Sequence, residues 1–448
     1  MAVVRPFVGT RYNPQIVTDL KAVVAPPYDV ISPTMQDELY AASPHNVVRL
    51  ILGKEKMNDD EYNNKYLRAA SCLQSWRTDT VLIDEKKKSF YFYEQEFRIP
   101  GGEKKRRMGF FAAVRIEDYK SGKIRAHEQT FAGPKADRLK LLRSTQCNLS
   151  PIFCLYSDPE KKAEAIAKKA MAKKPITDIT DKDGVRHRMW IANDKPSIKG
   201  IAEAMCNREL YIADGHHRYE TAVNYKLERC IASGTKDGKQ PYDYVMMFLC
   251  NAEQEGLTIL PTHRILSKDL DDCVDHDEVL EDFQEHFNVT PQKISMSNLD
   301  KSADTLLKAV SKAGKKGVSF GMVLPDGRAF VIQMKPKVDL AELIDEEIHP
   351  AVRGLDVTIL HHYVISKVWM GNPEIELDDD DILYSKDIAE ALDVLKRRKA
   401  CAVFLMNPTR MEQLREVAGA GQRMPHKSTY FYPKLLSGLV FRDLNAPW

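Results

Sequence analysis

The sequence predicts an α+β fold with mixed sheets and surrounding helices, and three observations support this prediction. Two β-rich segments, 89–99 and 106–118, flank a Gly101-Gly102 turn, as in a β-hairpin. An apolar strand ends at Asp214-Gly215 and runs directly into an amphipathic helix over 216–230. Strands and helices follow one another through all 448 residues without an internal repeat or a long linker.

Near the N-terminus, two consecutive prolines restrict the backbone. Pro26 and Pro27 bias residues 23–32 towards extended geometry. A helix is expected over 35–42, a strand over 46–52, and a longer amphipathic helix from Asp60 to Trp76. In the following hairpin, the basic run 104–107 could grip a phosphate, but a solvated hairpin end is expected.

In the middle of the chain, predicted helices alternate with predicted strands. The patterns predict a helix over 161–174, strands over 190–194, 209–215 and 242–251, and an extended segment over 256–266. The character changes near Ser267, where an acidic helix over 271–287 begins, followed by strands over 317–324 and 328–334. We therefore expect an N-terminal α+β region, 1–266, and a C-terminal α/β region, 267–448, which contributes to the same site.

Composition excludes several classes of protein. Lys and Arg number 66 and Asp and Glu 64, a net charge of +2, which argues against binding to nucleic acid or a membrane surface. No apolar run approaches the roughly 18 residues of a membrane span. The eight cysteines form no CxxC pair, so a reduced, cytoplasmic protein is expected. The sequence leaves the oligomeric state open, a homo-oligomer included.

The sharpest motif is Asp214-Gly215-His216-His217-Arg218, where the predicted strand meets the predicted helix. Glycine permits the tight turn, and the N–H groups of a first helical turn favour an anion. Arg218 adds a planar fork for phosphate oxygens, and the histidines can donate hydrogen bonds or move protons. Asp214 is a candidate metal ligand or an orienting group for a histidine. The alternative is a pair of histidines that only cap and pack the helix.

A second motif runs from Ile124 to Leu139 and contains His127 and Glu128 after a short strand. Glu128 is placed as a general base would be, with His127 beside it. Lys135 and Arg138 begin the next helix, where they could neutralise phosphates. These residues could equally be ordinary charges at a helix start.

Three other segments carry more polar groups than packing needs. Asp29 lies on the proline-stiffened loop, and His263 and Arg264 end an extended segment. The run 423–434 combines basic, hydroxyl and aromatic groups, among them Lys427, and could close over an anionic ligand. A plain aromatic strand with solvated lysines explains that run equally well.

These blocks resemble a widespread, mostly uncharacterised family of unknown function, in the same order along nearly the whole chain. The Asp-Gly-His-x-Arg box is also similar to the phosphate-binding box of the ParB/sulfiredoxin-like superfamily, which includes free serine kinases. That resemblance implies a ParB/sulfiredoxin-like core. It also implies ATP or ADP as donor with Mg²⁺, and L-serine as the acceptor that becomes O-phosphoserine.

Carried onto this sequence, the resemblance implies roles for the residues named above. Gly215, His216, His217 and Arg218 would hold the donor phosphates, while Asp214 would hold the metal. Glu128 would be the catalytic base, with Asp29 as its rival. The residues expected to assist phosphate binding are Lys135, Arg138 and Lys427, and those expected near serine are His127, Asp29, His263 and Arg264. A nucleotide-gated regulator, and a kinase or hydrolase for another metabolite, are the alternative functions.

Overall fold

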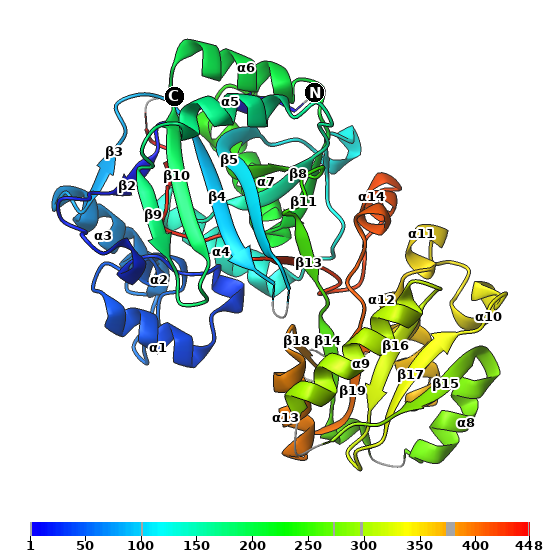
Figure 1. Cartoon of the computed structure of the whole chain (residues 1–448). Helices are drawn as coiled ribbons and strands as arrows, with labels where there is room; N and C mark the ends of the chain where they lie inside the picture. The colour runs from blue at the N-terminus through cyan, green and yellow to red at the C-terminus, as the bar shows by residue number, and fades with distance from the viewer. Residues whose placement is uncertain (1, 100–101, 272–273, 296–298, 373–380, 447) are drawn as a thin grey trace. The chain divides into compact units, whose positions relative to one another are not determined.

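The computed structural model describes residues 2–99, 102–271, 274–295, 299–372, 381–446 and 448 (Figure 1). The chain divides into two compact units. Unit 1 comprises Met1–Ala126, Thr130–Thr258 and Phe431–Trp448, and unit 2 comprises His127–Gln129 and Ile259–Tyr430. Each unit is built on its own mixture of helices and sheet, which confirms the α and β composition. The domain division predicted at residues 266 and 267 stays a prediction.

The core of unit 1 is a nine-stranded sheet in the order β6-β11-β8-β12-β5-β4-β10-β9, with β1 paired to β5. Its strands are β1 (Val4–Arg5), β4 (Phe90–Arg98), β5 (Lys104–Arg115), β6 (Ile124–Arg125), β8 (Ile152–Tyr156), β9 (Thr177–Thr180), β10 (Arg186–Ala192), β11 (Leu210–Asp214) and β12 (Tyr244–Asn251). The β6–β11 and β8–β12 pairs are parallel, whereas β4–β5, β5–β12 and β8–β11 are antiparallel. The sheet is therefore mixed, as predicted.

Alternation along the strands gives this sheet two different faces. On one face, Phe90, Phe110 and Met247 belong to a core that also holds buried residues of α5 (Lys162–Met171), α6 (Lys195–Met205) and α7 (His216–Ser233). Part of the other face packs against the C-terminal segment that begins at Phe431, since the ring centres of Phe431 and Phe153 lie 5.5 Å apart. The C-terminal segment thus contacts the same sheet that contains β11.

The hairpin is confirmed, because β4 and β5 pair antiparallel from Tyr91 opposite Phe111 to Arg98 opposite Lys104. The description of the basic run as solvated is wrong for one member. Lys104 and Arg106 are exposed, but Arg107 is 0% exposed. Its side chain lies on the sheet face rather than at the hairpin end, because strand alternation turns it inward.

Other unit 1 helices test the remaining N-terminal predictions. The helix α1 (Pro33–Ala42) is confirmed, but the strand over 46–52 is wrong, since Val48–Ile51 forms helix α2. The side chain of Asn46 accepts the Val48 N–H at 2.9 Å and so starts a helical turn. Helix α3 (Lys65–Thr78) starts later than predicted because Asn64 caps it. Residues 28–30 form a 3-10 turn within the predicted extended segment.

Three two-stranded sheets also occur: β2 (Thr10–Tyr12) pairs with β3 (Leu82–Asp84), β7 (Cys147–Asn148) with β21 (Arg442–Asp443), and β13 (Thr258–Leu260) with β20 (Tyr430–Tyr432). Helix α4 (Ala132–Thr145) packs on α7 and α3. No helix among the described residues is long and apolar enough to span a membrane.

Unit 2 is built on a six-stranded sheet in the order β15-β17-β16-β19-β14-β18. Every neighbouring pair in it is antiparallel. The strands are β14 (His263–Ser267), β15 (Phe287–Gln292), β16 (Ser319–Val323), β17 (Ala329–Met334), β18 (Ile382–Ser385) and β19 (Ala400–Met406). The helices are α8 (His276–His286), α9 (Leu299–Gly314), α10 (Leu340–Leu343), α11 (Pro350–Arg353), α12 (Asp356–Ile359), a π-helix (Leu360–Trp369), α13 (Ile388–Lys396) and α14 (Met411–Gly419).

Candidate functional site

The predicted motif lies at the turn between β11 and α7 in unit 1. Asp214 is the last residue of β11, and Gly215 has a φ of +93°, in the region that favours glycine. A Cβ on Gly215 would lie 3.0 Å from the guanidinium of Arg218. The glycine therefore allows both the turn and the close approach of Arg218, and it carries no side chain to cap the helix.

Asp214 is held between two cations. Arg218 donates from Nη2 to Oδ2 of Asp214 at 2.6 Å, and Lys434 donates from Nζ to Oδ1. Burial opposes ionisation of Asp214, but the charges of Lys434 and Arg218 hold its pKa below the usual range. Two cations thus share one carboxylate at the N-terminus of α7.

The other two guanidinium nitrogens of Arg218 have different surroundings. Nη1 donates to the carbonyl of Pro151, whereas Nε is buried without a hydrogen-bond partner in the described part of the chain. A buried N–H of this kind is costly to leave unpaired. An anion bound at this turn would supply the missing acceptor.

The two histidines have different surroundings. His216 is buried, and its charge contributes to lowering the pKa of Asp214. The Nε2 atom of His217 accepts the backbone N–H of Phe131 at 3.0 Å, and the two rings stack. His217 therefore ties the start of α7 to the start of α4.

Lys135 and Arg138, on α4, also lie in unit 1. Lys135 forms an ion pair with Glu220 at 3.1 Å. Arg138 donates to the carbonyl of Ile51 at 2.6 Å and lies 4.0 Å from the ring centre of Tyr28. The structure thus brings Arg138 and Arg218 to one cavity, which they line together with Tyr28.

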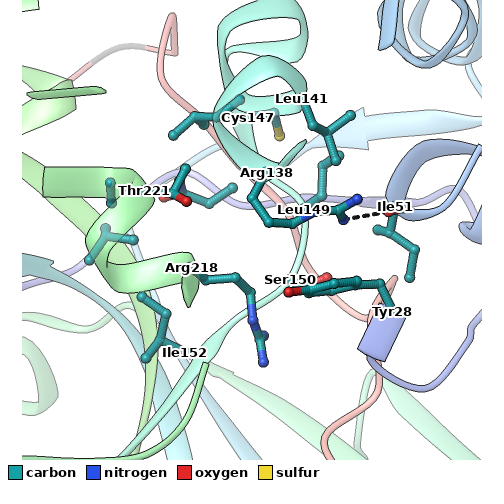
Figure 2. A pocket seen from close by; sticks show the side chains of 14 residues that line it. Tyr28, Ile51, Arg138, Leu141, Cys147, Leu149, Ser150, Ile152, Arg218 and Thr221 are labelled. Atoms are coloured by element: carbon teal, nitrogen blue, oxygen red, sulfur yellow. Dashed lines mark hydrogen bonds between the residues drawn. The ribbon is translucent and has the colours of Figure 1, made fainter. Parts of the chain in front are cut away.

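Figure 2 shows this cavity, which has a volume of about 60 Å³. Burial and the neighbouring charge of Asp29 raise the pKa of Tyr28 to about 12, so its phenol stays a hydrogen-bond donor at neutral pH. The remaining wall is largely apolar, with Leu141, Leu149 and Ile152 among its members. At roughly 15 Å³ for each water position, the cavity has room for about four waters. Of the residues of the Asp214–Arg218 motif, Arg218 lines it.

Asp29 itself is exposed in the 3-10 turn and does not line the cavity that its neighbour Tyr28 lines.

The contacts of Asp214 do not suit metal binding, since both of its carboxylate oxygens accept hydrogen bonds from cations. No group of three or more His, Cys, Asp or Glu side chains suited to a metal occurs among the described residues. The donor set therefore does not fit Mg²⁺ in this arrangement, and the metal role of Asp214 stays a prediction.

Glu128 and His127 lie in unit 2. The Met424 N–H donates to the carbonyl of His127 at 2.6 Å, and His127 Nε2 lies 2.9 Å from the hydroxyl of Thr429. Glu128 Oε1 accepts the backbone N–H of Lys427 at 3.1 Å and lies 3.1 Å from Nδ1 of His426. Glu128 and Lys427, predicted separately, are thus in direct contact.

Arg264 belongs to the same group in unit 2. Arg264 is 2% exposed, and its guanidinium donates to the carbonyls of Thr262 and Lys427. Burial lowers the pKa of Arg264 to about 10, which still leaves it charged at neutral pH. Burial also lowers the pKa of His263 to about 4, and its Nδ1 accepts the Met406 N–H at 3.2 Å. His263 is therefore neutral and engaged with β19.

Sequence reasoning missed Lys434, which contacts Asp214 at the β11–α7 turn, and also Arg107 and Gln95, which bind the main chain of 432–434. Lys434 ends the basic and aromatic run 423–434, in which Lys427 is the expected phosphate ligand. The composition of this run is the one sequence signal that pointed to Lys434. Its contact with Asp214 joins residues 220 positions apart, so spacing does not predict it. No sequence signal singled out Arg107 or Gln95. In the sequence, Arg107 cannot be told apart from the exposed basic residues beside it.

A family model described as "Protein of unknown function (DUF1015)" matches residues 4–358. No curated protein matches the sequence. Among solved structures, a free serine kinase in complex with AMP is similar at 13% identity and a TM-score of 0.32, covering 72% of this chain and 86% of that one. A conserved hypothetical protein from Pyrococcus furiosus is similar at 15% identity and a TM-score of 0.32, covering 73% and 92%.

Proposed function

The chain belongs to the DUF1015 family of proteins of unknown function, and we propose that it is a nucleotide-dependent small-molecule kinase. The favoured acceptor is free L-serine, with ATP or ADP as donor and O-phosphoserine as product. A ParB/sulfiredoxin-like core in unit 1 is part of the proposal.

The single observation that carries the proposal is the β11–α7 turn. A left-handed glycine, a first helical turn without a side-chain cap, and the Arg218 and Lys434 cations about one carboxylate form a mostly buried group. Such a group suits phosphate oxygens, because helix N–H groups and a guanidinium both donate to anions. The acceptor rests on different support, the likeness of Asp214-Gly215-His216-His217-Arg218 to the box of free serine kinases.

We assign the following roles. Gly215, His216 and Arg218 bind the donor phosphates, and His217 holds this turn against α4. Glu128, whose carboxylate is oriented by the Lys427 N–H, takes the proton of the acceptor hydroxyl on an oxygen. The nucleotide supplies the phosphoryl group: the acceptor oxygen bonds to the terminal phosphorus while the bond from that phosphorus to the bridging oxygen breaks.

The proposal is tested by phosphorus NMR of the purified chain with Mg²⁺, ATP or ADP, and a pool of amino acids. Each amino acid is then omitted in turn. We expect a phosphomonoester signal that disappears only when serine is omitted. Nucleotide turnover that no amino acid affects would replace the kinase by a hydrolase, and nucleotide binding without turnover would favour a regulator.

A further inference from the structure

Arg107 and Gln95 form a buried polar pair on the sheet of unit 1. They lie directly opposite each other on β5 and β4, and both are 0% exposed. Arg107 donates from Nη2 to the side-chain oxygen of Gln95. No carboxylate among the described residues lies within ion-pair distance of Arg107. Burying a guanidinium without an ionic partner is unfavourable, and an apolar pair would stabilise the sheet better.

The pair instead binds three consecutive carbonyls of the C-terminal segment. Arg107 donates to the carbonyls of Tyr432, at 3.2 Å, and Pro433. Gln95 donates from Nε2 to the carbonyl of Lys434 at 2.9 Å. The main chain of 432–434 is therefore held by hydrogen bonds from two side chains that rigid strands position.

Two aromatic contacts hold the residues just before Lys434 on the same sheet. The ring of Tyr432 meets that of Phe97 at 5.5 Å, and that of Phe431 meets Phe153 at 5.5 Å. Phe153 of β8 is in register with Asp214 of β11. The segment that carries Lys434 and the strand end that carries Asp214 are thus fixed to one sheet.

The placement of Lys434 has a chemical consequence. Lys434 and Arg218 both donate to Asp214, and both are mostly buried, with 13% and 12% of the side chain exposed. Two cationic side chains beside a helix N-terminus favour a bound anion, because all of these groups donate hydrogen bonds to it. Lys434 brings its charge from a segment outside the Asp214–Arg218 motif.

We infer that Lys434 contacts the bound phosphates beside Arg218, and that Arg107 and Gln95 are positioning residues that hold Lys434 there. The inference rests on the proposed nucleotide site. It adds a binding residue that the motif does not contain and explains why a guanidinium is buried in the sheet.

The test measures binding of ATP and of inorganic pyrophosphate by calorimetry, together with steady-state kinetics. Lys434→Ala should weaken the binding of ATP and of pyrophosphate about tenfold, the loss of one charged hydrogen bond, and Lys434→Arg, which keeps the charge, should recover part of it. Gln95→Met and Arg107→Met should raise the KM for nucleotide about three- to tenfold while the KM for serine changes less than twofold. Arg208→Lys is the matched control, because Arg208 also donates to a main-chain carbonyl in unit 1, that of Ser157.

The outcomes separate this inference from the proposed function. Unchanged ATP and pyrophosphate binding in a folded Lys434→Ala variant overturns the role of Lys434. If Gln95→Met lowers Tm but leaves nucleotide KM within twofold, the pair is structural only and the positioning role is overturned; this milder variant decides if Arg107→Met does not fold. Weakened binding in Lys434→Ala without any serine turnover would leave the inference standing and remove the kinase. A wild-type chain that binds neither ligand overturns both.

Discussion

Asp214 accepts hydrogen bonds from Lys434 on one carboxylate oxygen and from Arg218 on the other, although Lys434 is 220 residues further along the chain. The carboxylate thereby joins the end of β11, the first turn of α7 and the C-terminal segment. One side chain thus connects the stability of unit 1 to the electrostatics of the proposed phosphate site.

Asp214→Asn removes the charge while keeping the shape of the side chain. It leaves Lys434 and Arg218 mostly buried without a counter-charge, so we expect a loss of about 3 kcal/mol in the free energy of unfolding. Chemical denaturation at pH 7 measures this loss. Asp178→Asn, which breaks the more exposed pair with Arg186, is the control and should cost under about 1 kcal/mol.

The same pair of cations predicts a pH dependence. Because the folded pKa of Asp214 is depressed, its contribution to stability is fully present above the unfolded pKa of about 3.9. That contribution is lost as the pH falls through the lower, folded value. Wild type should therefore lose stability below about pH 4 more steeply than Asp214→Asn. Parallel curves of unfolding free energy against pH would contradict the assignment of the ion pair to Asp214.

Gly215→Ala places a Cβ 3.0 Å from the Arg218 guanidinium at a φ of +93°. We expect a stability loss of about 1–2 kcal/mol and nucleotide binding weakened at least tenfold, because Arg218 must move. Gly234→Ala is the matched control at the other end of α7, where φ is +67° and no atom lies within 4 Å. It should cost similar backbone strain yet leave the nucleotide Kd unchanged; equal effects on binding would argue against the turn as the site.

His217→Ala removes the acceptor for the Phe131 N–H and loosens the start of α4 beside the turn. Nucleotide binding should weaken about three- to tenfold, as measured by calorimetry. His349→Ala is a suitable control, since His349 accepts the Ala351 N–H at a helix start in unit 2. Nucleotide affinity that stays at the wild-type value in His217→Ala would count against a role for this histidine.

Glu128→Gln tests the proposed base. The amide can still accept the Lys427 N–H but cannot take a proton, so kcat should fall at least a hundredfold while nucleotide Kd changes little. The exposed Glu416→Gln variant on α14 should keep full activity. Full turnover in Glu128→Gln would remove this carboxylate from the chemistry and bring Asp29 forward.

Local patterns predicted much of the fold because they depend on neighbouring residues. The alternation in 89–99 and 106–118 predicted the β4–β5 hairpin, and the Asp214-Gly215 signal predicted the β11–α7 turn. The strand expected over 46–52 failed because a short apolar run does not distinguish a buried strand from a buried helical turn. There the side chain of Asn46 decides, by accepting the Val48 N–H.

The candidate site was only partly predictable for a different reason. Gly215 and Arg218 lie only three positions apart in sequence, so their motif is visible. Lys434 reaches Asp214 only through tertiary packing, and Arg107 differs from its exposed neighbour Arg106 only by the face of the strand it occupies. Such contacts depend on which segment covers which sheet face, and composition and spacing do not encode that directly.

The most direct test of the account is a crystal structure of the full chain with a non-hydrolysable ATP analogue bound. We predict phosphate oxygens at about 3 Å from backbone N–H groups of the first turn of α7 and from the side chains of Arg218 and Lys434. Phosphates bound away from Gly215, or a chain that remains without nucleotide at saturating concentration, would contradict the proposed site.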